Sequence, residues 1–301
     1  MRRRASALVL LGAWVCAVDA HAGRKLPPLP APKKPTPHAV ARWRPPAKPI
    51  PPRAAPPTPV EPPAAAAPEP PTDQPDAPDT EPPSDDNEPL PPAAATDPAS
   101  RYGHMGRATC LAEARKRTLP VVAVDPARGV LAPVRITGPL HGVSFHSAMP
   151  AAARKTSVYE IFDCRLVLAL DDLAQVLAKH DVVEVVHMSA YRPPPAKGWR
   201  DGELGTRHTG ALAIDAGTFV RKDGSKLNVE KDFHGAIGQR PCGEKTGPWP
   251  RTDEGVELRK ITCEALDAKL FHVFLTPGFN WAHRNHFHME VSAKGTHFYV
   301  R

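Results

Sequence analysis

The chain has 301 residues, of which 39 are proline, and its formal net charge is +7. Residues 24–98 hold 27 of the 39 prolines and few large apolar side chains. Such a stretch cannot bury enough surface to offset the entropy of ordering it, which excludes one packed core over the whole chain.

Residues 1–22 have the pattern of a secretory signal peptide. Three arginines follow Met1, an apolar run extends from Ala5 to Val18, and a small-x-small cleavage site follows. The apolar run is shorter than the roughly 20 residues that a membrane-spanning helix needs. We therefore predict a protein that is secreted or periplasmic after cleavage, with no stable membrane span.

Residues 23–100 are expected to form a disordered proline-rich linker, because proline-rich segments favour extended polyproline II conformations. Its charge is segregated: residues 24–53 contain eight Lys and Arg and no acid, and residues 61–97 contain ten acids and no base. Such blocks either serve solubility alone or place a basic arm on an anionic envelope polymer.

Residues 101–301 are expected to form a single domain. They hold 16 of the 18 aromatic residues and carry a net charge of +7, with 28 Lys and Arg against 21 Asp and Glu. A region of this length can bury a sizeable core. Its positive charge favours an acidic partner.

The four cysteines of this domain predict disulfides. They are an even set in a chain that reaches an oxidising compartment, and none lies in a C-x-x-C pair, so disulfides are favoured over metal thiolates. Three connectivities are possible, and the spacing does not select one. We predict Cys110 with Cys164, and Cys242 with Cys263, the second pair closing a loop rich in Gly and Pro; buried free thiols are the alternative.

A helix and a buried strand are predicted next along the chain. Leucines recur at helical spacing from Asp163 to His180, with Asp163 as a possible N-cap. Residues 181–190 have the β-branched composition of a buried strand. Arg192 lies where this strand ends, and loops after strands are where functional sites are usually built.

A second strand, from Ala211 to about Val220, carries an acidic residue among apolar ones. Asp215 is costly in such a strand unless it is paired or bound to a metal. His208 lies seven residues earlier, in the loop that leads into the strand. The spacing of His208 and Asp215 is weak evidence by itself.

The segment 283–290 brings two more histidines. On a strand, His286 and His288 project from one face while Phe287 and Met289 pack the other. Two histidines and one carboxylate form a ligand set that leaves a fourth tetrahedral position open, as in catalytic zinc sites. The alternative is a pair of ordinary core or surface histidines.

Three motifs occur in this order in the chain: Ser189-Ala190-Tyr191-Arg192, Thr206-x-His208 through Ala213-x-Asp215, and His283-x-x-His286-x-His288. Together they resemble the bacterial extensin-like C-terminal family, which is related to zinc D-Ala-D-Ala carboxypeptidases, murein endopeptidases and the hedgehog fold. The resemblance implies an α+β fold, in which helices pack on one side of a small antiparallel sheet and the open face holds zinc.

The resemblance also implies roles for individual residues. By matching motif positions, His208, Asp215 and His288 ligate Zn²⁺, and His286 acts in catalysis or supports a ligand. Arg192 stabilises the substrate oxyanion or holds a carboxylate. The chemistry itself also needs a general base, for which His286 is the favoured candidate. Glu290, which alternation puts on the same strand face, is a weaker candidate or orients a ligand imidazole.

Two functions follow from this reading. The first is an exported zinc peptidase that hydrolyses amide bonds in peptidoglycan stem peptides or cross-links. The alternative is a non-catalytic peptidoglycan-binding or adhesion module that retains the zinc-site fold. In both, the expected partner is peptidoglycan or another anionic cell-wall polymer, and no nucleic acid is involved.

Overall fold

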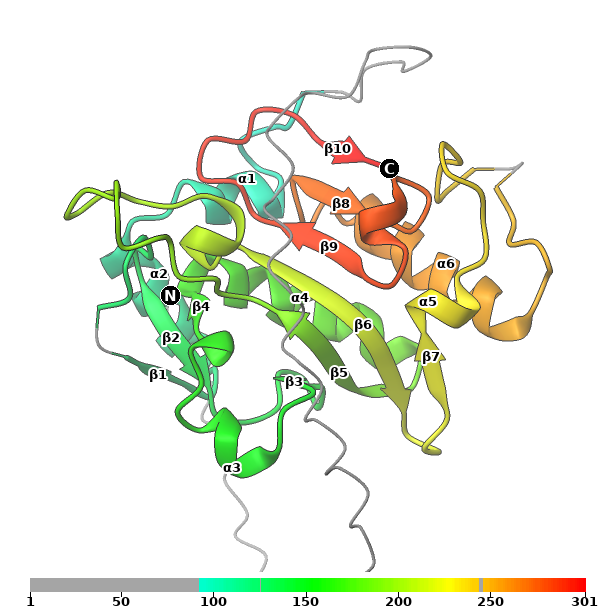
Figure 1. Cartoon of the computed structure of the whole chain (residues 1–301), viewed down its shortest axis with the longest axis horizontal. Coiled ribbons are helices and arrows are strands. Elements are labelled where there is room, and N and C mark those ends of the chain that lie inside the picture. The colour runs from blue at the N-terminus through cyan, green and yellow to red at the C-terminus, as the bar shows by residue number, and fades with distance from the viewer. Residues whose placement is uncertain (1–91, 125, 244–245) are drawn as a thin grey trace, which may run out of the picture. The chain divides into compact units, whose positions relative to one another are not determined.

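The structure is a computed structural model that describes residues 92–124, 126–243 and 246–301 (Figure 1). The predicted signal peptide and most of the predicted linker lie outside the described residues. Within the described residues, no helix has the length and apolar character needed to cross a membrane.

The packed region begins earlier than the predicted domain start at Arg101. Helix α1 spans Pro98–Gly103, and Ala99 is completely buried. Before α1, the backbone N–H of Ala93 donates to the carbonyl oxygen of Thr296 at 2.9 Å. The last residues assigned to the linker are therefore part of the domain, because they pair with its C-terminal segment.

One mixed sheet of seven strands dominates the described region (Figure 1). Its central pairs are antiparallel, whereas β3 pairs β5 and β10 pairs β8 in parallel. The expectation of an antiparallel sheet is thus right at the centre and wrong at both ends. The strand order is β10 (Tyr299–Val300), β8 (Val273–Leu275), β9 (Phe287–Glu290), β6 (Ala213–Arg221), β5 (Val182–Ser189) and β3 (Ser144–Ser147), and β7 (Lys226–Asn228) also pairs β6.

A small antiparallel sheet and several helices complete the domain. The small sheet contains β1 (Val121–Ala123), β2 (Pro133–Ile136) and β4 (Phe162–Asp163). The α-helices besides α1 are α2 (Arg107–Lys116), α3 (Ala151–Arg154), α4 (Cys164–Lys179), α5 (Val229–Asp232) and α6 (Asp253–Asp267). Single 3₁₀ turns are η1 (Val158–Glu160), η2 (Arg207–Gly210) and η3 (Trp281–His283).

Helix α4 matches the helix that leucine spacing predicts. Asp163 is its N-cap and accepts a hydrogen bond from the backbone N–H of Arg165 at 3.0 Å. The four leucines of the predicted stripe are almost completely buried. Each such side chain contributes about 2 kcal/mol of burial free energy, so α4 is anchored by packing rather than by its cap alone.

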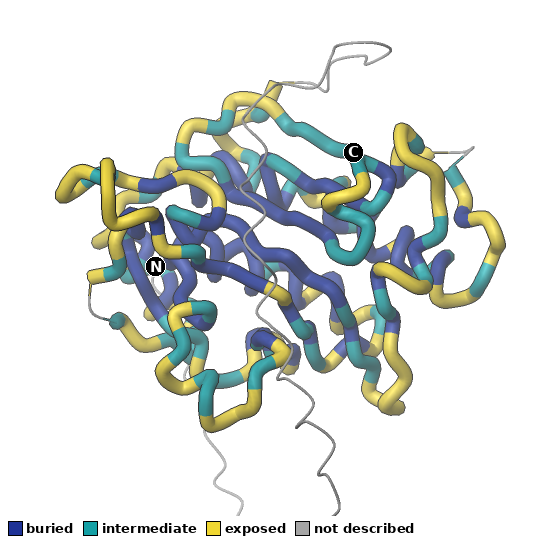
Figure 2. Tube along the Cα trace, viewed as in Figure 1, coloured by how far each residue is buried: buried dark blue, intermediate teal, exposed yellow. Residues whose placement is uncertain are grey.

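The alternation of β6 and β9 sends apolar and polar side chains to opposite faces. Ile214 and Met289 are register partners and belong to the core cluster that includes the α4 leucines. Asp215 and His288, the next pair in register, point to the other face. Figures 1 and 2 show α4 behind the buried central strands, so the polar pair lies on the sheet face opposite this helix.

Both predicted disulfides are confirmed. Cys110 on α2 is joined to Cys164 at the start of α4, and Cys242 is joined to Cys263 on α6. The first links α2 to the buried helix α4. The second fastens the loop before α6 to that helix.

Candidate metal centre

His208 is presented by the tight turn η2, immediately before β6. The turn is closed by the N–H of Ala211, which donates to the His208 carbonyl at 3.0 Å. The imidazole Nδ1 lies 2.8 Å from the carbonyl oxygen of Ala190 at the end of β5. A carbonyl can only accept, so Nδ1 carries a proton, and Nε2 is the ring nitrogen that faces Asp215.

Asp215 and His288 come from the neighbouring strands β6 and β9. They are direct register partners, and only 1% and 6% of their surfaces are exposed. The Oδ1 atom of Asp215 lies 3.0 Å from Nδ1 of His288. Sheet pairing alone therefore brings these two potential ligands together.

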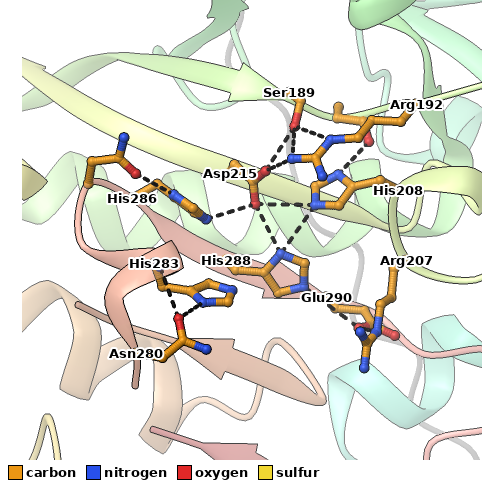
Figure 3. Close-up of polar contacts among 12 residues, drawn as sticks. Ser189, Arg192, Arg207, His208, Asp215, Asn280, His283, His286, His288 and Glu290 are labelled. Carbon is orange, nitrogen blue, oxygen red and sulfur yellow. Dashed lines mark hydrogen bonds and ion pairs between the residues drawn. The ribbon is translucent and has the colours of Figure 1, made fainter. Parts of the chain in front are cut away.

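The three facing atoms fit a tetrahedral zinc ion (Figure 3). His208 Nε2 lies 3.2 Å from Asp215 Oδ1 and 3.2 Å from His288 Nδ1. Ligands at the usual zinc distances of about 2.0–2.1 Å are separated by about 3.3 Å along a tetrahedral edge. In the described residues, this His/Asp/His set is also the group whose ligand atoms converge as metal ligands do.

The second oxygen of Asp215 is held by two residues from the end of β5. Ser189 Oγ donates to Oδ2 at 2.8 Å, and Arg192 Nη2 donates to the same oxygen at 2.6 Å. Arg192 Nη2 also lies 2.9 Å from Ser189 Oγ. The structure thus places Arg192 on the carboxylate of a potential ligand, and Ser189, which has no assigned role in the sequence analysis, completes the support.

The charges of the centre depend on one another. Burial by itself would raise the pKa of Asp215, but the neighbouring His208 and His288 imidazoles outweigh it and hold the pKa well below its usual value. Burial by itself would lower the pKa of His288, but its contacts with Asp215 and Glu290 raise it to about 9. In the absence of a metal, a proton on His288 therefore compensates the buried carboxylate.

His286 reaches the centre from a different element than predicted. Strand β9 begins at Phe287, so His286 lies in the turn before it rather than on the strand. Its Nε2 is 3.4 Å from Asp215 Oδ1, and its Nδ1 is 2.8 Å from the side-chain oxygen of Asn285. Donation from Nδ1 leaves the Nε2 lone pair directed toward Asp215, and burial lowers the pKa of His286.

His283 is a further member of the site to which the sequence analysis gives no role. Its ring centroid lies 5.1 Å from that of His286 and 5.8 Å from that of His288. Its Nδ1 is 2.8 Å from the side-chain oxygen of Asn280, the N-cap of η3. Burial lowers its pKa to about 3, so the ring is neutral near pH 7. Its place in the His-x-x-His-x-His motif was the available signal.

Glu290 lies behind His288 rather than beside the open coordination position. Its Oε2 is 3.8 Å from His288 Nε2, the ring nitrogen that faces away from Asp215. The same oxygen is 3.7 Å from Arg207 Nε. This placement favours the role of orienting a ligand imidazole over that of a general base.

The fold and this cluster define an α+β domain with a histidine–aspartate centre on one face of a mixed sheet. The family model described as extensin-like protein C-terminus matches residues 108–301, and the chain therefore belongs to that family. Comparison with curated proteins and with solved structures finds no match.

Proposed function

We propose that the protein is a zinc-dependent peptidase that hydrolyses amide bonds in the stem peptides or cross-links of peptidoglycan. The observation that carries the proposal is the His208, Asp215 and His288 set, whose three facing atoms lie 3.0–3.2 Å apart. Three potential ligand atoms this close, on buried side chains, would fit a cation that replaces the proton between them, with one tetrahedral position left for substrate or water.

The chain supplies the remaining groups for amide hydrolysis. When bound, zinc would act as a Lewis acid that polarises a carbonyl and makes water more acidic. The Nε2 atom of His286 faces the same centre and accepts the proton of the attacking water, as a general base does. Arg192 and Ser189 keep Asp215 oriented through Oδ2, which leaves Oδ1 facing the histidines.

The substrate class is supported by charge and by family resemblance. Residues 101–301 carry a net charge of +7, which favours anionic polymers such as a cell wall with free peptide carboxylates. The three motifs resemble those of wall-directed zinc peptidases. Export is consistent with the two disulfides, which form in oxidising compartments.

Digestion of purified peptidoglycan by the zinc-loaded full chain tests the proposal. Mass spectrometry of the released fragments identifies the bond that is cut. We expect release by the wild type, loss on chelation, recovery on adding zinc, and loss in His288→Ala. A wild type that binds one zinc ion per chain and still releases no fragment would exclude the peptidase and leave the wall-binding module.

A further inference from the structure

A hollow of about 330 Å³ lies between α5, the loop that joins α5 to α6, and the segment that joins β8 to β9. This volume is at the lower end of the range for small-molecule sites, about 300–1,000 Å³. We call it the tryptophan groove. Its lining includes Glu230, Ile237, Trp249, Asn280, Trp281 and Arg284.

The groove brings several exposed apolar side chains together in one place. Eight large hydrophobic residues are exposed in the described residues, and Ile237, Trp249 and Trp281 are three of them. Trp249 is 86% exposed and Trp281 is 71% exposed. Indole rings are large apolar surfaces that proteins normally cover, so two of them around one hollow indicate a binding site.

The charged side chains of Arg284 and Glu230 line the same groove. The Arg284 guanidinium lies 4.8 Å from the Trp281 ring centroid and fixes that ring by a cation–π contact. Glu230 forms an ion pair with Arg284 at 3.8 Å, and both side chains are about half exposed, at 54% and 41%. The carboxylate and guanidinium are therefore available to hydroxyl and amide groups of a ligand.

Asn280 connects the groove to the metal centre. It lines the groove, and its side-chain oxygen contacts both the backbone N–H and the Nδ1 of His283. A ligand in the groove would thus contact Asn280, which in turn contacts His283 at the metal centre.

We propose that the tryptophan groove binds the glycan strand of the wall polymer, as a subsite for N-acetylated amino sugars. The axial C–H groups of a pyranose ring form an apolar face that stacks on an indole, and its hydroxyl and acetamide groups need hydrogen-bonding partners around the edge. The groove offers both in one hollow: two exposed indoles, and the side chains of Glu230 and Arg284. The choice of sugar rests on the proposed function, because a stem peptide at the metal centre is covalently attached to such a strand.

The test uses a neutral probe, a hexamer of β-1,4-linked N-acetylglucosamine, titrated calorimetrically into the zinc-free full chain. A neutral probe avoids a response of the basic segments to charge. We expect binding by the wild type and a Kd at least about tenfold higher in Trp281→Ala and Trp249→Ala, since tenfold corresponds to about 1.4 kcal/mol and aromatic anchors commonly contribute that much or more. Leu204→Ala is the matched control, because Leu204 is 54% exposed and is not among the residues that line the groove.

Circular dichroism checks that the exposed-residue variants remain folded. No binding by the wild type, or equal Kd values in the tryptophan variants, would overturn the proposal. So would tryptophan-dependent binding of a sugar-free stem peptide or of anionic lipid vesicles without binding of the hexamer. Because the titration needs neither zinc nor turnover, failure of the peptidase proposal would leave its result unchanged.

Discussion

Replacing Asp215 by asparagine separates metal binding from folding. In the wild type, Oδ2 accepts hydrogen bonds from Ser189 and Arg192, and Oδ1 faces the imidazoles of His208 and His288. The asparagine oxygen can keep the first pair of contacts, and its NH₂ group then faces the imidazoles. The variant removes the anionic ligand and puts a donor in its place, without opening a cavity in the sheet.

The size of the effect follows from the ligand count. Structural zinc sites with four ligands bind with about 10–16 kcal/mol, so one ligand contributes on the order of 3–4 kcal/mol. We therefore expect Asp215→Asn to lower zinc affinity by about 10²- to 10³-fold. Loss of the negative charge acts in the same direction.

Competition against a chelating dye of known zinc affinity measures the change at neutral pH. Asp223→Asn is the control, because Asp223 lies in the exposed turn between β6 and β7 and contacts Ser225 locally. Far-UV circular dichroism establishes that both variants are folded. A folded Asp215→Asn protein that binds zinc within about tenfold of the wild type would refute the assignment of Asp215 as a ligand.

His286→Gln should retain zinc within about tenfold and lose about 100-fold or more in peptidoglycan hydrolysis, because it removes a general base but no ligand; wild-type turnover would place the base elsewhere. Glu160→Gln should lower stability at pH 7 by about 3 kcal/mol. Burial raises the pKa of Glu160, but its contacts with His187 and Ser147 lower it to about 2. The stabilisation by the Glu160 carboxylate is present above its unfolded pKa of about 4.5 and disappears as pH falls toward 2. The difference in Tm between variant and wild type should therefore shrink between these pH values. A constant difference would contradict the role of this carboxylate. Deleting residues 24–91 should leave Tm unchanged because of their composition, whereas extending the deletion through residue 98 should lower Tm because the described part of that segment packs on the domain.

Local periodicity explains why parts of the fold could be predicted from sequence. The α4 leucines follow the 3.6-residue repeat and begin after an aspartate that can cap a helix, and the structure has this helix at Cys164–Lys179. The β-branched composition of residues 181–190 predicts β5, and the apolar run around Asp215 predicts β6. Both observed strands lie within two residues of the predicted limits at their ends.

The outer strands of the large sheet could not be predicted in the same way. Strand β3 is Ser-Phe-His-Ser, and β10 has two residues, so neither shows a usable alternation. Their parallel pairing depends on long connections, and the one from β3 to β5 contains α4. No local signal encodes such a partner, and the expected antiparallel sheet was wrong there.

Some residues of the candidate centre could be predicted from the sequence because their residue types are unusual at those positions. An aspartate inside an apolar strand and two histidines at alternate positions both require a compensating partner. His283 and Ser189 belong to the quoted motifs, but neither requires a partner by its position, since a turn histidine and a strand-end serine are common without a site. Arg192 was identified, but its contact with Asp215 depends on the pairing of β5 with β6.

The centre owes its geometry to contacts that involve no metal. The β6–β9 register fixes Asp215 beside His288, and the Ala190 carbonyl fixes the ring of His208. Ser189 and Arg192 fix the carboxylate. In small zinc domains that are unfolded without metal, the binding free energy is used for folding. Here the core and two disulfides supply contacts that need no metal. If the centre binds zinc as proposed, we therefore expect most of the binding free energy to appear as affinity and the fourth position to stay open for chemistry.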